Sequence, residues 1–330
     1  MIRHFCTYFD HRYLPHALAL TASLRQHCGG FRLWALCMDD AALSALRALA
    51  IPEVTPISLD EFEHGDDALA AAKRNRSTIE YYFTCTPSLP LYVLRLDPSI
   101  EAVTYLDADL YFFADPQPLF DEIGGASVAI IPHRFPAENA PRFERYGIYN
   151  VGWLTFRRTA DGLACLQWWR ERCIEWCFDR EEPSRFADQK YLDEWPSRFK
   201  SVHIVRHKGA NVASWNLANY EMTRRDGRVF VDDEPLIFFH FHHFKRRRTW
   251  LFETDFAPHG ARVNRVLKHD VLTPYCRVLD ENAATAARVC AASAGAPIRP
   301  MARSSRWPLL AMLSDYATGN LLVYVGGRVR

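Results

Sequence analysis

Short apolar runs alternate with amphipathic runs over the first sixty residues, and this alternation constrains the fold more than any other feature of the sequence. The apolar runs have the composition of buried strands, and the runs between them have helical spacing. In order, the runs occupy residues 2–8, 14–30, 31–38, 39–50 and 54–59. Pro15 suits the first turn of the first helix, and Asp39 or Asp40 suits the cap of the second. Strands that alternate with helices predict an α/β fold with a mixed, mostly parallel sheet flanked by helices.

The rest of the chain continues this pattern with longer connections. Pro87 and Pro90 interrupt the helical spacing of residues 77–96 and predict two helical pieces there. Further expected elements are strands at 127–132 and 151–156, a long polar loop at 133–150, helices at 161–178 and 186–196, and a hairpin at 228–244 turning at Asp232-Asp233. We therefore predict one large domain over residues 1–272, with halves 1–125 and 126–272, and a C-terminal extension over 273–330.

Composition limits the classes of function. The net charge is +1, from 40 basic and 39 acidic residues, so no global field would attract nucleic acid or an anionic membrane. The nine cysteines contain no CxxC pair, which favours buried free thiols in a reducing compartment over disulfides or a zinc site. The start lacks the pattern of a secretory signal, and no run is apolar and long enough to cross a bilayer. We expect a cytoplasmic protein.

Two carboxylates stand one residue apart in the stretch VTYLDADLYFF, directly after an apolar strand. Asp107 and Asp109 would repel each other if both were drawn out of water without a cation. The carboxyl ends of strands in open α/β sheets are where ligands bind, and Ala108 is small enough to let both carboxylates turn toward one point. Carboxylate oxygens of this kind suit Mg²⁺ or Mn²⁺. The alternative is that both are solvated turn residues.

A second cluster lies in the stretch PLIFFHFHHF. Strand alternation predicts His240 and His242 on one face and His243 on the other, so two imidazoles would share a site. Imidazole is a good ligand for Mn²⁺ and a poor one for Mg²⁺. Histidines hydrogen-bonded within the core are the simpler interpretation. The basic run 245–248 that follows is either a solvated face or a source of phosphate contacts.

Taken together, these features resemble the nucleotide-sugar glycosyltransferases of the GT-A (Rossmann-like) fold, most closely family 8, which includes glycogenin and bacterial lipopolysaccharide galactosyltransferases. YLDADLYFF is similar to the DXD motif of these enzymes, YNVGWLTF to their N-x-G strand, and ADQKYLDEW to their DQ helix. The late HF histidine is matched by His240-Phe241. The motif around it lacks the glycine and proline of the family pattern, so either His240 or His242 is the expected ligand. The resemblance spans roughly residues 2–250.

The resemblance implies a role for each matching residue. Asp107, Asp109, His240 and His242 are the implied metal ligands, with Mn²⁺ or Mg²⁺ as the ion. The implied donor contacts are Thr7, Tyr8, Asp10, Tyr13, Arg76, Asp107 and Lys245, and the implied sugar contacts are Asn150, Asp188 and Gln189.

Several of these residues also have plainer interpretations. Arg76 and Glu80 are spaced to form an ion pair on a helix, and Asp188 is placed to cap one. By position alone, His133 and Arg134 are candidate acceptor contacts.

The expected function is metal-dependent transfer of a sugar from a nucleoside-diphosphate sugar, with UDP favoured, to a glycan or lipid-linked glycan, with retention of configuration. A pyrophosphorylase would want a glycine-rich loop after the first strand, and TYFDHRYLP has none. A phosphohydrolase with an aspartate nucleophile would place the acidic pair after the first strand. A non-catalytic sugar-nucleotide-binding or scaffold protein is the remaining alternative.

The C-terminal extension has two interpretations. Trp307, Leu309, Leu310 and Leu313 form an apolar stripe beside two arginines, Arg303 and Arg306. Such a stripe is either packed in the core or placed at a membrane interface. We expect peripheral association with the inner face of the membrane, or an oligomer or acceptor contact, to involve this region.

Overall fold

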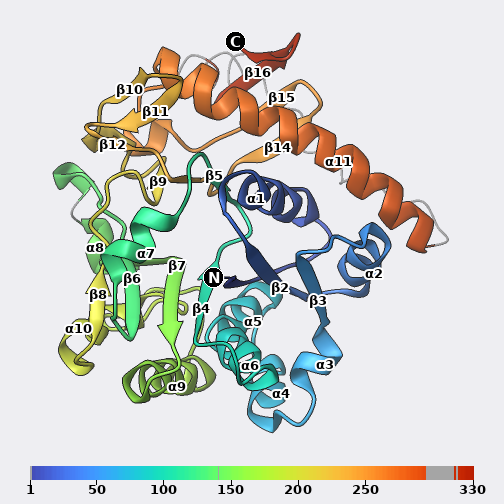
Figure 1. Cartoon of the computed structure of the whole chain (residues 1–330), viewed down its shortest axis with the longest axis vertical. Coiled ribbons are helices and arrows are strands. Elements are labelled where there is room, and N and C mark those ends of the chain that lie inside the picture. The colour runs from blue at the N-terminus through green and yellow to red at the C-terminus, as the bar shows by residue number, and fades with distance from the viewer. Residues whose placement is uncertain (1, 140, 295–315, 317–318) are drawn as a thin grey trace.

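A seven-stranded sheet runs through the centre of the computed structural model, which describes residues 2–139, 141–294, 316 and 319–330 (Figure 1). In spatial order its strands are β3 (Val54–Ser58), β2 (Phe31–Cys37), β1 (Arg3–Phe9), β4 (Ala102–Leu106), β7 (Tyr149–Arg157), β6 (Val128–Pro132) and β8 (Val202–Ile204). Only β7 runs antiparallel to its neighbours in this sheet. The predicted mixed, mostly parallel sheet is confirmed, and β3 lies at an edge as Pro56 requires.

Helices cover both faces of the sheet (Figure 1). One face is packed by α1 (Leu14–His27), α2 (Asp40–Leu49) and α7 (Gln117–Ile123). The other face is packed by α3 (Leu59–Glu63), α4 (Asp67–Lys73), α5 (Thr78–Cys85), α6 (Ser88–Leu96), α9 (Ala160–Glu175) and α10 (Trp195–Arg198). These two layers bury the apolar faces of every central strand. Apolar clusters on the two faces of the sheet therefore flank β1 and β4.

Local sequence signals account for where several helices begin. The Asp39 side chain accepts a hydrogen bond from the Ala42 amide at 2.8 Å and caps α2. Ser77 and Glu80 form a capping box that starts α5. The two helical pieces expected in residues 77–96 are present as α5 and α6. The turn at Asp232-Asp233 joins β11 (Arg228–Val231) to β12 (Glu234–Pro235), but the expected hairpin does not continue to residue 244, because Phe238–His240 pairs in another sheet.

Three expectations need correction. The connection between β6 and β7 is not a plain loop, since it holds a short 3-10 turn at Ala137–Asn139 and the helix α8 (Pro141–Tyr146). The helix expected at 186–196 is a 3-10 helix at Lys190–Glu194 followed by the single turn α10. Asp188 does not cap it, because the N-cap position belongs to Gln189 and carries no side-chain hydrogen bond. A 3-10 helix has three residues per turn, so its apolar residues do not show the 3.6-residue period from which the helix was predicted.

Three smaller sheets surround the central one. The first contains β5 (Leu110–Phe112), β13 (Phe238–His240) and β9 (Val212–Ala213). The second contains β10 (Met222–Arg225), β11 and β12, and the third contains β14 (Lys245–Arg248), β15 (Leu251–Glu253), β16 (Leu321–Val325) and β17 (Arg328–Val329). Since β5 follows β4 after only Asp107-Ala108-Asp109, the acidic pair joins the central sheet to the first small sheet.

The long helix α11 (Thr273–Ala294) crosses the outside of α1 and α2 (Figure 1). It continues directly from a π-helix at Leu267–Leu272. Tyr275 and Cys276 are fully buried against the core of the third small sheet, so the described part of the C-terminal extension packs with the preceding domain. The division after residue 272 stays a prediction. The apolar stripe at 307–313 lies outside the described residues.

Within the described ranges, no helix combines the length and the apolar character needed to cross a bilayer. All nine cysteines are buried and free, as the sequence predicted.

Candidate active site

The acidic pair lies at the carboxyl end of β4, where the backbone passes from the central sheet to β5. The Asp109 side chain is 9% exposed and that of Asp107 is 30% exposed, so neither carboxylate is fully open to solvent. The Tyr105 hydroxyl donates a hydrogen bond to Asp107 Oδ1 at 2.8 Å. This bond orients Asp107 from within the sheet, and the burial of Asp109 argues against the interpretation of the pair as two solvated turn residues.

His240 comes from a distant part of the sequence to meet both carboxylates. Strand β13 pairs antiparallel with β5, and this register places His240 opposite Leu110, the residue after Asp109. Its Nε2 atom lies 3.1 Å from Asp109 Oδ1 and 3.5 Å from Asp107 Oδ2. The imidazole is 2% exposed. A long-range strand pairing therefore assembles three of the predicted ligands.

His242 also reaches the site, although by a different route from the one predicted. Strand β13 ends at His240, and a turn with a left-handed His243 follows it. Ligand atoms of Asp109, His240 and His242 lie within 4.8 Å of one another. The expectation that His243 points to the opposite face is wrong, since its ring stacks on that of His242 with 4.0 Å between centroids. Strand alternation does not apply beyond the end of the strand.

Asn211 and Gly152 determine where the His240 ring lies. The Asn211 amide oxygen lies 3.3 Å from His240 Nδ1, and the Asn211 amide nitrogen donates to the Pro132 carbonyl at 3.4 Å. This arrangement leaves the Nε2 atom of His240 directed at the carboxylates. Gly152, on β7, supplies the space for the ring, because a Cβ atom there would lie 2.8 Å from both Cε1 and Nδ1 of His240.

The charges of these groups are coupled. Burial raises the pKa of Asp107 to about 6. Although burial opposes it, the charge and hydrogen bond of His240 hold the pKa of Asp109 well below its usual range. The same carboxylates, again against burial, raise the pKa of His240. Without a cation, a proton on His240 partly neutralises the acidic pair, and a bound cation would take over that role.

This donor set fits a divalent cation. Two carboxylates and two imidazoles converge, and two of these ligands, Asp107 and His240, have an orienting hydrogen bond from the surrounding structure, as metal ligands commonly have. A mixture of oxygen and imidazole nitrogen ligands suits Mn²⁺ better than Mg²⁺. Asp109, His240 and His242 are the residues positioned to hold the ion directly.

The predicted sugar contacts form a network beside the metal ligands. The Asn150 amide nitrogen donates to Gln189 Oε1 at 3.2 Å, and Gln189 Nε2 donates to the Tyr146 carbonyl at 2.9 Å. Asn150 Oδ1 accepts from the Gly152 amide at 3.0 Å, which connects the network to the wall of the His240 pocket. His133 Nε2 lies 3.4 Å from the Asn150 amide nitrogen, and burial lowers the pKa of His133 to about 3, so the ring is neutral.

Asp188 is a buried carboxyl at this network. Asp188 is 5% exposed. Burial raises the pKa of its carboxyl to about 7, and the negative charge of Asp107 also raises this pKa. A hydrogen bond with the Thr86 side chain lowers the pKa of Asp188 and so opposes this rise. The Thr86 hydroxyl also lies 3.2 Å from the Tyr8 hydroxyl. The charge of Asp107 therefore acts on Asp188, and a carboxyl of this kind changes charge near neutral pH. Its predicted contact with the sugar stays a prediction.

The predicted donor contacts divide into two groups. Tyr8 points toward Tyr82 and Tyr105, with ring centroids 6.1 and 5.8 Å away, and the charges of Asp188 and Asp107 act on its hydroxyl. Thr7, on the opposite face of β1, is fully buried and its hydroxyl has no hydrogen-bond partner among the described residues. The structure therefore brings Tyr8 to the site and leaves Thr7 beneath the sheet.

The turn after β1 holds the next two predicted donor contacts. Asp10 is buried and accepts from Arg12 Nε at 2.9 Å and from the Arg12 amide at 3.0 Å. Tyr13 is 40% exposed, and partial burial together with the carboxylates of Asp109 and Asp107 raises its pKa. Tyr13 thus stands beside the acidic pair at the surface, while Asp10 shapes the turn that presents it.

The remaining predicted contacts lie further out. Arg76 donates to the Ile174 carbonyl at 3.2 Å and stacks 3.9 Å from the Phe178 ring centroid, and it does not pair with Glu80, which caps α5. Lys245 is exposed at the start of β14 and forms no ion pair with any described residue. Arg134 donates to the carbonyls of His207 and Ala210, so its guanidinium is used within the fold.

Sequence reasoning missed several residues that build the site. Asn211 and Tyr105 orient His240 and Asp107, and Trp215 packs edge-on against both histidine rings at 5.0 and 5.6 Å. Tyr275 of α11 stacks on Phe241 at 3.5 Å. Tyr105 had a signal, since it stands two residues before Asp107 on the same strand face. The others are far from the motifs in sequence and had none.

The raised pKa of Asp188 gives a prediction about stability. Because its native pKa exceeds the unfolded value, the native state holds the proton more tightly between about pH 4 and pH 7, and this part of the stability is lost as pH rises through that window. The loss amounts to about 4 kcal/mol at most. Asp188→Asn mimics the protonated carboxyl, so its melting temperature should exceed that of the wild type at pH 8 and match it near pH 4.

Calorimetric melting of both proteins in EDTA across this pH range checks the prediction. Asp115→Asn, at an exposed turn, is the control for losing one carboxylate. A difference between Asp188→Asn and the wild type that does not change with pH would contradict the expected role of burial.

The mixed sheet of this strand order, with helices on both faces, has the GT-A glycosyltransferase fold. The crystal structure of an active-site mutant of LgtC matches it with a TM-score of 0.50 and 13% identity, covering 86% of this chain and 95% of that one. Mouse xyloside xylosyltransferase 1 in its apo form has a TM-score of 0.48 and 13% identity, covering 73% and 98%. The likeness to LgtC concerns the fold alone.

The chain belongs to the family of the Bacillus subtilis (strain 168) proteins YfnD and YfnF. YfnD is 36% identical over 247 residues, which are 73% of this chain and 78% of YfnD. YfnF is 34% identical over 244 residues, which are 72% of this chain and 80% of YfnF. Both relatives are described as uncharacterised. No family model matches the chain.

Proposed function

We propose that this protein is a metal-dependent glycosyltransferase of family 8, which transfers a hexose from a nucleoside-diphosphate sugar, UDP favoured, to a glycan or lipid-linked glycan. The observation that carries the proposal is the convergence of Asp109, His240 and His242, with Asp107 beside them, at the carboxyl edge of a GT-A sheet. Neither an ordinary surface turn nor a packed core needs two carboxylates and two imidazoles in one place.

The metal ligands in this proposal are Asp107, Asp109, His240 and His242, with Mn²⁺ preferred over Mg²⁺. When bound, the cation supplies positive charge to the diphosphate leaving group, which is the electrostatic contribution that such a transfer needs most. Tyr105 holds Asp107 and Asn211 holds His240, so the protein keeps the ligands in position before the substrate arrives.

The donor nucleotide is proposed to lie over the tyrosines at the end of β1. Tyr8 and Tyr13 offer ring faces for stacking, and both are close enough to the acidic pair for its charge to act on their hydroxyls. Asp10 shapes the turn that presents Tyr13. Arg76 and Lys245 lie further out and are proposed to contact the donor from there, and Lys245 forms no ion pair with any described residue. Thr7 would contribute only by supporting the turn from beneath.

The transferred sugar is proposed to contact Asn150, Asp188 and Gln189. Their hydrogen-bond network adjoins Gly152 and therefore the His240 pocket. Asp188, with its raised pKa, is suited either to accept from a sugar hydroxyl or to donate to one near neutral pH. Retention of configuration follows from the resemblance to family 8. Cytoplasmic location, contact with the inner face of the membrane and oligomerisation stay predictions.

A thermal-shift panel tests this function. UDP-sugars at about 100 times their Kd should raise the melting temperature by about 5 °C in Mn²⁺ and by much less in EDTA, because binding to the native state adds about 2.7 kcal/mol. Release of UDP from the best donor then separates an enzyme from a binding protein. A shift without UDP release would favour the non-catalytic alternative, and no shift with any UDP-sugar would contradict the choice of donor.

A further inference from the structure

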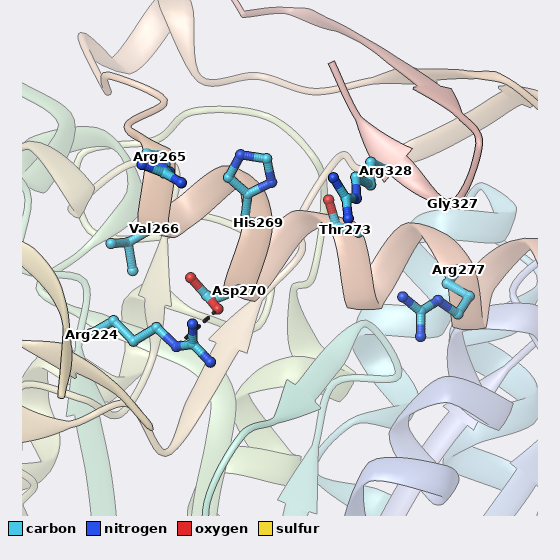
Figure 2. Close-up of a pocket in the computed structure, with 9 residues that line it drawn as sticks. All are labelled: Arg224, Arg265, Val266, His269, Asp270, Thr273, Arg277, Gly327 and Arg328. Atoms are coloured by element: carbon cyan, nitrogen blue, oxygen red, sulfur yellow. Dashed lines mark ion pairs between the residues drawn. The ribbon is translucent and has the colours of Figure 1, made fainter. Parts of the chain in front are cut away.

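A pocket of about 580 Å³ opens beside the start of α11 (Figure 2). It is lined by Arg224, Arg265, Val266, His269, Asp270, Thr273, Arg277, Gly327 and Arg328. None of these residues belongs to the metal site. Tyr275 faces that site through Phe241, whereas Arg277 follows two residues later, about 200° further around the helix axis. The pocket and the metal site thus lie on different sides of α11.

Positive charge dominates the lining. Four guanidinium groups face one carboxylate, that of Asp270, which lies 3.4 Å from Arg224 Nε (Figure 2). In the part of the chain that the structure describes, no carboxylate forms an ion pair with Arg265, Arg277 or Arg328. The chain as a whole is nearly neutral, with a net charge of +1. A local excess of this size in a hollow attracts anions to that place.

Tertiary contacts assemble the pocket from three separate segments. Arg224 of β10 is held by its ion pair with Asp270 in the π-helix. The Thr273 hydroxyl donates to the Lys268 carbonyl at 2.8 Å and accepts from the Val329 amide at 3.1 Å, which fastens β17 to α11. Between β16 and β17, Gly326 and Gly327 form a two-residue turn with φ of +61° and +77°, and this turn brings Arg328 to the rim.

A second pocket of the molecule offers a comparison, because the charge of an arginine in it is neutralised by a carboxylate. It has about 460 Å³ and contains Arg170, which binds both oxygens of Asp66 at 2.5 and 2.6 Å. An arginine paired in this way has little capacity left for a ligand. The pocket beside α11 keeps three guanidinium groups free of such pairing, and planar guanidinium groups match the oxygens of phosphate in pairs.

We propose that this arginine pocket, made by Arg224, Arg265, Arg277 and Arg328, binds the phosphate or diphosphate group of a ligand other than the sugar donor. Its volume admits a diphosphate with part of the molecule attached to it. The ligand is either a soluble phosphorylated molecule or a phosphate of a lipid headgroup. Neither the metal ligands nor the predicted sugar contacts take part, so this site exists whether or not the proposed transfer reaction does.

Calorimetric titration of the full chain with sodium pyrophosphate in EDTA at low ionic strength tests the proposal. EDTA removes any cation that would bring pyrophosphate to the acidic pair. The wild type and Asp109→Asn should bind alike, whereas the double variant Arg265→Gln/Arg328→Gln should bind about 100-fold more weakly, since each charge-assisted contact accounts for about tenfold. The control Arg25→Gln/Arg198→Gln removes two exposed arginines that are paired with Glu53 and Glu194 elsewhere.

A second variant should strengthen pyrophosphate binding instead of weakening it. Asp270→Asn removes the one competing carboxylate and should strengthen binding by up to about fivefold. The proposal is overturned if the wild type does not bind pyrophosphate, if the Arg265/Arg328 double variant binds as well as the wild type, or if the control loses binding equally.

Sedimentation with vesicles identifies the source of the phosphate. Vesicles of phosphatidylcholine with phosphatidic acid should carry down the wild type, in competition with pyrophosphate, if the ligand is a lipid headgroup. Pyrophosphate binding without sedimentation assigns the pocket to a soluble phosphorylated ligand. Both results support an anion site, and in both the Arg265/Arg328 double variant should fail to respond.

Discussion

Asp109→Asn should lower Mn²⁺-dependent sugar transfer by about 100- to 1000-fold. The substitution keeps the shape of the side chain but removes the charge of the carboxylate that lies 3.1 Å from His240 Nε2, and with it the most buried acidic ligand of the site. Loss of one preorganised electrostatic contact commonly has an effect of this size. Release of UDP from the donor, measured with the wild type and the variant at saturating Mn²⁺, gives the result.

Two comparisons make this measurement specific. Asp233→Asn removes an exposed carboxylate from the turn between β11 and β12 and should leave turnover unchanged. The circular dichroism spectrum of Asp109→Asn should match that of the wild type, because an isosteric change at the turn between β4 and β5 leaves the sheets intact. Turnover within a few-fold of the wild type in a folded Asp109→Asn protein would rule out the proposed metal site.

Gly152→Ala should weaken Mn²⁺ binding by about 10- to 100-fold without touching a ligand. The added methyl group would lie 2.7 Å from Asn150 Oδ1 and 2.8 Å from the His240 ring, well inside van der Waals contact. His240 cannot retreat, because Asn211 holds one side of the ring and Trp215 packs against another. Displacing a metal ligand or its hydrogen-bonding neighbour commonly lowers metal affinity by about 10- to 100-fold. The overpacking should also lower the free energy of unfolding by about 1–3 kcal/mol.

Gly29→Ala is the matched control, since no atom lies within 4 Å of a Cβ atom at that position. Titration of Mn²⁺ followed by calorimetry measures both variants. An unchanged Mn²⁺ affinity in Gly152→Ala, with Gly29→Ala equal to the wild type, would mean that His240 is not a ligand or that the site is looser than the structure indicates.

Much of the architecture could be predicted from local patterns. The period of apolar residues identified β1, α1, β2, α2 and β3, and prolines marked the break between α5 and α6, but the short helices α3 and α4 were not predicted. The same local reasoning failed where elements were short or irregular. The 3-10 turn after Gln189 has too few residues for a helical period, and the turn at His243 ends the alternation that β13 begins.

The kinds of ligand in the candidate site could be predicted from the sequence, but the contacts that bring them together could not. Acidic residues after a buried strand and a cluster of histidines indicate a metal site whatever their separation in sequence. Their meeting depends on β5 pairing with β13, and the precision of the meeting depends on Asn211 and Gly152. No motif marks Asn211, because its importance lies in a contact with a residue on another strand.

The sequence by itself determined the α/β class, the order of the main elements and the kinds of ligand gathered for a cation. These properties follow from side-chain periodicity and from ligand chemistry, which act over a few residues. Only the tertiary structure decided that Tyr8 and not Thr7 faces the site, that α11 packs against α1 and α2, and that four arginines share one pocket. Those outcomes depend on strand pairing and packing between distant segments, and such contacts leave no local pattern in the chain.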